Sequence, residues 1–145
     1  MKALIQRVSS ASVEIEGEVV GEITQGLLLF LGVEKGDDKQ KADKLLEKIL
    51  KYRIFSDRND RMNLSLIDIL GELLIVSQFT LVADTQKGLR PSFSSAGLPE
   101  DSKTLYEYFV EQAAKSGLKI ATGCFGADMA VSLVNDGPVT FNLSI

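Results

Sequence analysis

The chain has 145 residues, of which 45% are hydrophobic and 25% charged, so it is long enough for one domain with a substantial core. It has no histidine and one cysteine, which excludes Ser-His-Asp and Cys-His catalysis, histidine-based zinc or haem sites and an internal disulfide. The net charge of −4 argues against a protein that coats long nucleic acids, because such proteins carry a basic surplus.

Composition also indicates where the chain works. No apolar run approaches the roughly 20 residues that a membrane span needs, and the N-terminal stretch from Met1 to Arg7 acquires a charge too soon for a signal peptide. A single cysteine, Cys124, fits a reducing compartment. We therefore expect a cytoplasmic protein without membrane contact, in which residues 1–145 form a single domain. Catalysis would have to use carboxylates, hydroxyls, lysine, tyrosine, backbone groups or the substrate itself.

The first third of the chain predicts a hairpin, a central strand and a helix. Residues 2–20 alternate as a strand does, with a turn at residues 16–18, and residues 27–33 form an apolar strand. Asp37 followed by Gln40 resembles a capping box, which predicts the start of a helix. The apolar face of this helix has helical spacing: Ala42, Leu45, Leu46, Ile49 and Leu50.

The middle of the chain predicts short strands around a charged turn. Residues 52–55 indicate a short strand, residues 56–63 a charged turn, and residues 64–70 either a strand or a turn. Residues 73–76 are all apolar, as in a strand buried on both faces.

The chain is organised around the segment that follows this buried strand. Four hydrogen-bonding or aromatic side chains come in succession: Ser77, Gln78, Phe79 and Thr80. A Gly- and Pro-containing loop with Lys87 and Arg90 follows. A rigid strand that leads polar groups into a basic loop is a common way to build a site, although many strands end in ordinary loops.

The last third predicts a second helix and three strands. Residues 102–116 form the helix, and residues 118–121, 127–134 and 139–145 the strands, with a tight turn at residues 135–138. The buried face of the helix is expected to carry Leu105, Tyr108, Phe109 and Ala113. Many strands in hairpin order with two main helices indicate an α+β fold with a curled, mostly antiparallel, barrel-like sheet.

Several single residues could carry chemistry. Thr80 or Ser77 as a nucleophile would need a carboxylate or lysine as base, and none lies at obvious reach, so Thr80 is interpreted as a hydrogen-bonding residue. Cys124, without a histidine or cation beside it, is interpreted as inert. Arg7 interrupts an apolar strand and either faces solvent or holds backbone carbonyls of another segment. Gly137-Pro138 reads as a plain trans turn, although a cis bond would aim two carbonyls in one direction.

Two motifs resemble the signatures of the D-aminoacyl-tRNA deacylase family, in the expected order and separation: Ser77-Gln78-Phe79-Thr80-Leu81 and Asn135-Asp136-Gly137-Pro138-Val139-Thr140. Shorter stretches also match: residues 6–8, 87–93 and 126–129. The resemblance spans residues 1–141 and shows no departure at the motif positions.

The resemblance implies a homodimer that hydrolyses the ester between a D-amino acid and the 3′-terminal adenosine of tRNA. We expect no cofactor and no metal-ligating residues, and the effect of a metal ion on activity stays open. In that family the Gly137-Pro138 pair is cis and enters the partner's pocket, which Ser77, Gln78, Phe79 and Thr80 line. The resemblance also implies that Phe125 and Met129 flank the terminal adenine and that Arg7 holds the Gly137-Pro138 turn in place.

Handedness would then be judged by sterics. If two fixed carbonyls occupy the place of an L side chain, any L Cβ collides with them, whereas glycine has no Cβ to exclude. We therefore expect hydrolysis of glycyl-tRNA as well as D-aminoacyl-tRNA, in proofreading of tRNA charging. Two other functions stay open from the sequence: a module that binds a nucleotide or nucleic-acid end without chemistry, and a small peptidase or amidase that uses Thr80.

Overall fold

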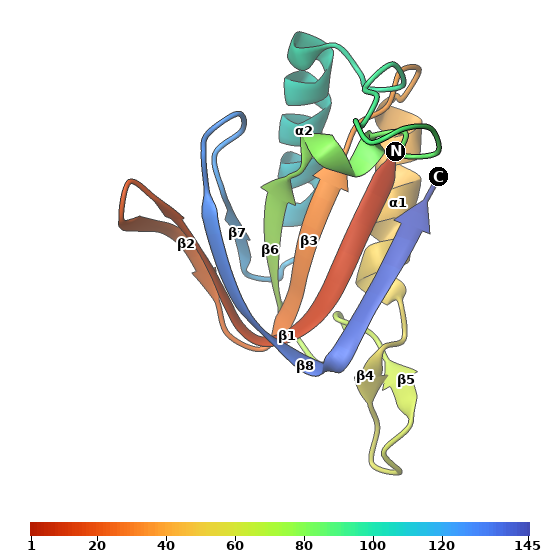
Figure 1. The fold of residues 1–145 in the computed structure, drawn as a ribbon. Coiled ribbons are helices and arrows are strands. Elements are labelled where there is room, and N and C mark those ends of the chain that lie inside the picture. The colour runs from red at the N-terminus through yellow and green to blue at the C-terminus, as the bar shows by residue number, and fades with distance from the viewer.

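The computed structural model describes all 145 residues, and Figure 1 shows two helices behind a strongly curved sheet. The elements in chain order are β1 (Lys2–Ile15), β2 (Glu18–Ile23), β3 (Gly26–Gly32), α1 (Lys39–Lys51), β4 (Phe55–Ser56), β5 (Met62–Leu64), β6 (Glu72–Ser77), the 3₁₀ helix η1 (Phe79–Val82), α2 (Pro99–Ala114), β7 (Ile120–Thr122) and β8 (Ala130–Ser144). Neither helix has the length and apolar character that a membrane crossing requires.

The main sheet has the order β2-β1-β3-β6-β7, and β8 pairs with the other edge of β1. Strand β1 pairs antiparallel with β2, β3 and β8, whereas β3–β6 and β6–β7 are parallel. The first half of β1 is hydrogen-bonded to β3 and the second half to β2, so the sheet curls where β1 changes partner. The predicted α+β fold with a curled, mostly antiparallel sheet is confirmed.

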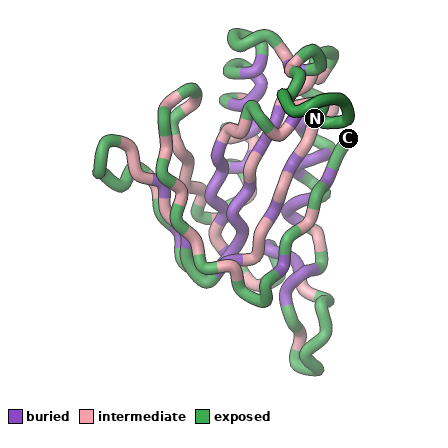
Figure 2. Tube along the Cα trace, in the orientation of Figure 1, coloured by how far each residue is buried: buried purple, intermediate pink, exposed green.

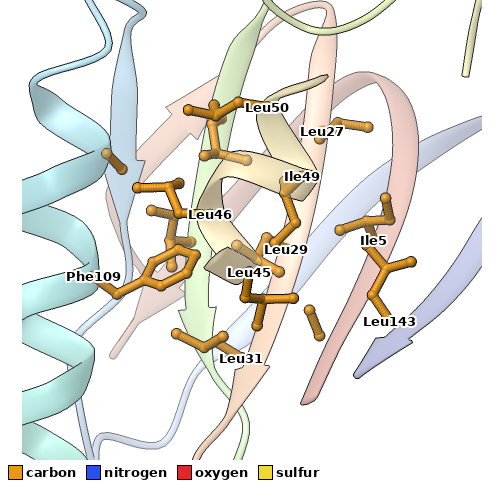
Figure 3. Close-up of a cluster of buried hydrophobic side chains, with 14 of the residues drawn as sticks. Ile5, Leu27, Leu29, Leu31, Leu45, Leu46, Ile49, Leu50, Phe109 and Leu143 are labelled. Atoms are coloured by element: carbon orange, nitrogen blue, oxygen red, sulfur yellow. The ribbon is translucent and has the colours of Figure 1, made fainter. Parts of the chain in front are cut away.

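The curled sheet has a core on each side. One core lies between the helices and the sheet, and Figure 3 shows α1 and α2 side chains such as Leu45 and Phe109 packed against Ile5 and Leu29. The other core lies inside the curl and includes Leu28. Strand β3 is apolar throughout because successive side chains enter opposite cores.

The capping box predicted at Asp37 is wrong by one residue. The N-cap of α1 is Asp38, whose Oδ1 accepts from the Lys41 N–H at 2.9 Å. Asp37 instead binds the Met1 ammonium at 2.8 Å, and its other oxygen accepts from the Glu34 N–H at 2.7 Å. The predicted apolar face of α1 is buried as expected.

Helix α2 begins three residues earlier than predicted, at Pro99, because proline suits the first turn of a helix. Its fully buried tyrosine is Tyr106, whereas the predicted Tyr108 is only partly buried against the same core. Tyr108 lies at the edge of the helix pair, where its hydroxyl donates to Asp43 Oδ1 at 2.8 Å.

The two strands predicted at 127–134 and 139–145, and the turn between them, are one strand, β8. The chain from Ala130 to Ser144 stays paired with β1, and residues 127–129 lie outside it. Pairing is irregular in the middle, where β8 passes from Thr140 to Asn135 while β1 passes only from Gln6 to Val8. The extra residues of β8 therefore bulge out of the sheet and carry the Gly-Pro pair.

The remaining short strands also differ from the prediction. The charged segment 56–63 is not only a turn, because it supplies one residue of β4 and most of β5, which pair antiparallel as a separate hairpin. Residues 65–70 form turns rather than a strand, and the strand predicted at 118–121 is shifted to β7.

Candidate functional site

A cavity of about 540 Å³ opens where the parallel strands β3 and β6 end. The start of α2 and the bend before β8 form its other walls. Five predicted site residues line it together: Ser77, Gln78, Phe79, Phe125 and Met129. Loops and side chains at the carboxyl ends of parallel strands often form ligand sites.

The end of β6 explains how the motif is presented. The ladder between β3 and β6 ends at Leu31 and Ser77, and the Gln78 N–H makes the final bond to the Leu31 carbonyl at 2.8 Å. Helix η1 begins at once, and its first two N–H groups, those of Phe79 and Thr80, precede any acceptor within the helix. The Gln78 side chain makes no capping bond. These two N–H groups can therefore donate hydrogen bonds to an oxyanion that develops beside the cavity.

Thr80 lies at the edge of the cavity rather than in its wall. Its exposed hydroxyl accepts a hydrogen bond from Gln78 Nε2 at 2.6 Å and has no carboxylate or lysine partner. A threonine without a base is a weak nucleophile. The geometry therefore favours a hydrogen-bonding Thr80 over a covalent catalyst.

Two apolar side chains, those of Phe125 and Met129, also line the cavity. The Phe125 ring packs against Tyr106 at 5.7 Å between centroids, with an angle of 45° between the rings. A Cβ added to Gly123 would lie 2.5 Å from Met129 Sδ, so glycine lets the methionine cross the bend. Phe125 and Met129 are half-buried and offer flat apolar surface to a planar ring.

Tyr106 is a residue that sequence reasoning missed. Its buried hydroxyl donates to the Ile75 carbonyl at 2.9 Å, which ties α2 to β6 behind the cavity. Burial, with a smaller effect from the nearby Cys124, raises the pKa of Tyr106 to about 12. Its spacing of four residues from Ser102 and three from Phe109 was the signal that could have placed it on the buried face.

An aromatic pair connects the cavity to a loop that carries two basic residues. Phe79 is 53% exposed and stacks on Phe93, with ring centroids 4.5 Å apart and an angle of 21°. Phe93 belongs to the loop that carries Lys87 and Arg90, both of them exposed and without a carboxylate within 4.0 Å. The stack of Phe79 on Phe93 therefore links the Ser77–Thr80 segment to a loop with two basic side chains that form no ion pair.

The Gly137-Pro138 peptide bond is cis, and both residues are exposed. Gly137 has φ of +139°, and a Cβ there would lie 2.6 Å from Val139 Cγ2. Both the conformation and the contact require glycine at this position. The turn thus presents main chain with no side chain beyond the proline ring.

Polar side chains brace this turn. Arg7 Nε donates to the Asp136 carbonyl at 3.0 Å, and Arg7 Nη1 donates to the Ile54 carbonyl at 2.8 Å. Asn135 Oδ1 accepts from the Val139 N–H at 3.0 Å, across the bulge. The guanidinium fork fits two carbonyls at once, which answers the question that the sequence left open for Arg7.

The cavity opens at the end of β6, and the turn belongs to the middle of β8; Figure 1 shows these two segments at opposite ends of the sheet. Arg7 pairs with Leu27 of β3, whereas the cavity begins at Leu31, so the two are separated by about 13 Å at the usual rise per strand residue. One chain therefore does not bring Arg7, Gly137 and Pro138 to the other site residues. No three acidic or cysteine side chains lie close enough to hold a metal ion.

Comparisons with known proteins cover the whole chain. The family described as D-Tyr-tRNA(Tyr) deacylase matches residues 4–144. A D-aminoacyl-tRNA deacylase of Pseudoalteromonas translucida is 67% identical, and one of Aeromonas hydrophila is 63% identical, each over 100% of both chains.

Two solved structures share the fold. One, titled c-Myc DNA Unwinding Element Binding Protein, is 38% identical with a TM-score of 0.94 and covers 100% of this chain and 99% of its own. The other, described as a probable eukaryotic D-amino acid tRNA deacylase, is 14% identical with a TM-score of 0.87 and covers 99% of this chain and 98% of its own.

Proposed function

This chain belongs to the D-Tyr-tRNA(Tyr) deacylase family, and we propose that it hydrolyses the ester that joins a D-amino acid to the 3′-terminal adenosine of tRNA. The products are the free amino acid and tRNA. The observation that carries the proposal is the cavity whose walls gather Ser77, Gln78 and Phe79 with Phe125 and Met129.

The adenine of the terminal nucleotide enters between Phe125 and Met129. The flat apolar wall that these side chains form, backed by the buried Tyr106, supports this placement. The RNA strand then leaves past Phe79, where the unpaired cations Lys87 and Arg90 suit its phosphates.

The reaction needs little from side chains, because an aminoacyl ester is already activated. A water attacks the ester carbon, and the N–H groups of Phe79 and Thr80 stabilise the oxyanion that forms. The ribose 2′-OH beside the ester positions or activates that water. Substrate assistance of this kind fits a chain without histidine.

This mechanism requires the ribose 2′-OH of the substrate and does not require the Thr80 hydroxyl. RNA that ends in 2′-deoxyadenosine is expected to be a poor substrate, as measured by release of its D-amino acid. Full activity on the deoxy substrate, together with a dead Thr80→Ala variant, would instead restore the covalent threonine mechanism and the peptidase hypothesis.

The chirality filter is the cis Gly137-Pro138 turn of a second copy in a homodimer. Two observations support it: the turn is exposed and braced, and it lies about 13 Å along the sheet from the cavity of its own chain. Main-chain carbonyls in the pocket collide with the Cβ of any L residue, whereas a D residue directs its side chain to solvent.

A filter made of main chain cannot exclude glycine, which has no Cβ. We therefore expect the enzyme to release glycine from glycyl-tRNA as well as D-amino acids. Complete resistance of glycyl-tRNA would contradict the main-chain filter but not the deacylase activity. The physiological role that follows is proofreading of tRNA charging in the cytoplasm.

A binding module for a nucleic-acid end is the second candidate. It is favoured by the 38% identical structure, whose title names a protein that binds a DNA unwinding element. The two candidates differ in whether a bond is broken.

The test is release of D-tyrosine from D-tyrosyl-tRNA, with L-tyrosyl-tRNA as the matched control and spontaneous hydrolysis as the baseline. The proposal predicts rapid loss of the D ester and baseline loss of the L ester. Binding of both RNAs without faster hydrolysis of either would favour the binding module.

A further inference from the structure

The β4–β5 hairpin projects from the body of the protein, away from the helices and the main sheet (Figure 1). Its root is fixed by Phe55, which is 3% exposed and belongs to the core under the helices. Residues 58–63 at its outer end are all exposed, as the green tip in Figure 2 shows. The hairpin lines no part of the cavity, so neither the core nor the pocket explains its length.

Arginine is concentrated on this hairpin. The chain has five arginines: Arg7, Arg53, Arg58, Arg61 and Arg90. Three of the five belong to the hairpin or its root, in a protein whose net charge is −4. None of these three has a carboxylate within 4.0 Å. Arg53 Nη1 donates to Asn63 Oδ1 at 3.5 Å, so Arg58 and Arg61, both exposed, are the guanidinium groups left for phosphate, which such groups bind with two parallel hydrogen bonds.

The acidic residues of the hairpin form no ion pair with these arginines. Asp57 Oδ1 accepts from the backbone N–H groups of Asn59 and Arg61, at 2.8 and 3.1 Å. These bonds lower the pKa of Asp57 and use its carboxylate to shape the turn. Asp60 occupies a left-handed position at the tip, with φ of 58°, and forms no ion pair.

The hairpin is fastened to the Gly-Pro turn. The Arg7 guanidinium bonds the Asp136 carbonyl at the turn and the Ile54 carbonyl, which directly precedes β4. Wherever the turn docks, the hairpin therefore docks beside it. Arg58 follows Ile54 by four residues, so the tip reaches about 13 Å beyond this anchor in an extended chain.

We propose that the β4–β5 hairpin is an arm that binds phosphates of the tRNA held in the partner subunit's pocket. This rests on the proposed function, because entry of the turn into that pocket is what brings the arm beside the RNA. The pocket reads the terminal adenosine and the arm holds the adjoining acceptor stem. Each copy then judges and holds the substrate that its partner cleaves.

The test compares two charge reversals of equal size. R58E/R61E alters the arm, and K44E/K48E alters two exposed lysines on the outer face of α1, which form no ion pair. Each variant is assayed on D-tyrosyl-tRNA and on the 3′ D-tyrosyl ester of adenosine, which ends before it reaches the arm. Both variants change only exposed side chains, and circular dichroism checks their folding.

If the arm binds phosphates, R58E/R61E should raise KM for D-tyrosyl-tRNA about tenfold and leave kcat unchanged. The log–log salt slope should fall by about 1 for each phosphate that the arm no longer neutralises. The adenosine ester and K44E/K48E should behave as the wild type does. R58Q/R61Q should show a smaller rise in KM, which keeps the test valid if the reversal unfolds the hairpin.

Failure of the arm and failure of the proposed function give different results. If the arm variants and K44E/K48E have equal KM values on D-tyrosyl-tRNA, the arm proposal is overturned and the proposed function is not. The same holds if the arm variants lose as much activity on the adenosine ester as on D-tyrosyl-tRNA. A wild-type protein that cleaves neither substrate overturns the proposed function, and the arm falls with it.

Discussion

The cavity at Ser77 and the turn at Gly137 are built in opposite ways. The cavity presents side chains, and its aromatic wall is supported from behind: Phe125 packs on Tyr106, and Tyr106 is hydrogen-bonded to β6. The turn presents main chain, is exposed, and is fixed by the side chain of Arg7.

The proposed function gives a reason for this difference, because each region then recognises a different part of the substrate. A planar base is recognised by apolar surface, which only side chains supply. A filter that rejects every L residue must not depend on side-chain identity, and main chain is the same for every amino acid. In the proposed function neither region is sufficient alone, and the sheet holds them about 13 Å apart within one chain.

The largest effect is expected from Gly137→Ala, which breaks the turn without touching the cavity. The new Cβ would lie 2.6 Å from Val139 Cγ2 at φ of +139°, so the carbonyls must move. We expect kcat/KM for D-tyrosyl-tRNA to fall about a hundredfold, the loss typical of an ångström-scale displacement. Gly17→Ala is the control, because Gly17 has φ of +81° with no atom near its Cβ position. Equal activity of the two variants would contradict the role of the turn.

Arg7→Ala removes the brace and leaves the turn sequence intact. It deletes two hydrogen bonds from a charged group whose side chain is 11% exposed, so we expect a loss of about 2 kcal/mol in the free energy of unfolding. Activity should fall about tenfold, with weaker rejection of L-tyrosyl-tRNA. Urea denaturation and the D/L activity ratio measure both effects. Arg7→Lys should rescue little, because an ammonium cannot span both carbonyls; full rescue would count against the brace.

Tyr106→Phe acts on the support of the cavity and has a smaller effect. Losing the hydrogen bond to Ile75 should cost about 1 kcal/mol of stability near pH 8 and raise KM two- to threefold. The raised pKa of about 12 means that the folded state holds this proton more tightly than the unfolded state does, where the pKa is near 10. The stabilisation is complete below pH 10 and is lost between pH 10 and 12. Tyr106→Phe should therefore flatten the fall in stability over that range; an unchanged slope would show that Tyr106 does not cause it.

Thr80→Ala should change least, because the hydroxyl only accepts a bond from Gln78 and the backbone N–H stays in place. We expect a loss of activity below about threefold, in line with one exposed neutral hydrogen bond. Single-turnover hydrolysis of D-tyrosyl-tRNA measures it. A loss above a hundredfold would make the hydroxyl part of the chemistry.

The sequence predicted the parts of the fold that local pattern determines. Helix α1 showed its apolar period, and β3 showed the unbroken apolar run of a strand with a core on each face. The first motif located Ser77, Gln78 and Phe79 of the cavity, and the second located the Gly137-Pro138 turn. Tyr106 was missed because a tyrosine two residues away fits the helix period almost as well, and only packing against Phe125 decides between them.

Long-range pairing was outside the reach of local patterns. Asn135 to Pro138 reads as a turn between two strands, yet both sides pair with the same β1, and only that pairing makes β8 one strand. The β4–β5 hairpin was read as a charged turn because its strands are too short to show alternation.

The central claim is that the cavity and the turn of one functional site come from different copies. Mixing two inactive variants tests it most directly: Gly137→Ala, with an intact cavity, and Ala127→Trp, whose indole fills the cavity. After subunit exchange at equal amounts, half of the dimers are mixed, and each mixed dimer holds one intact cavity facing one intact turn. The account predicts recovery of about a quarter of wild-type deacylation of D-tyrosyl-tRNA, from the two-fold symmetry of such a dimer. A mixture that stays as inactive as its two components would contradict it.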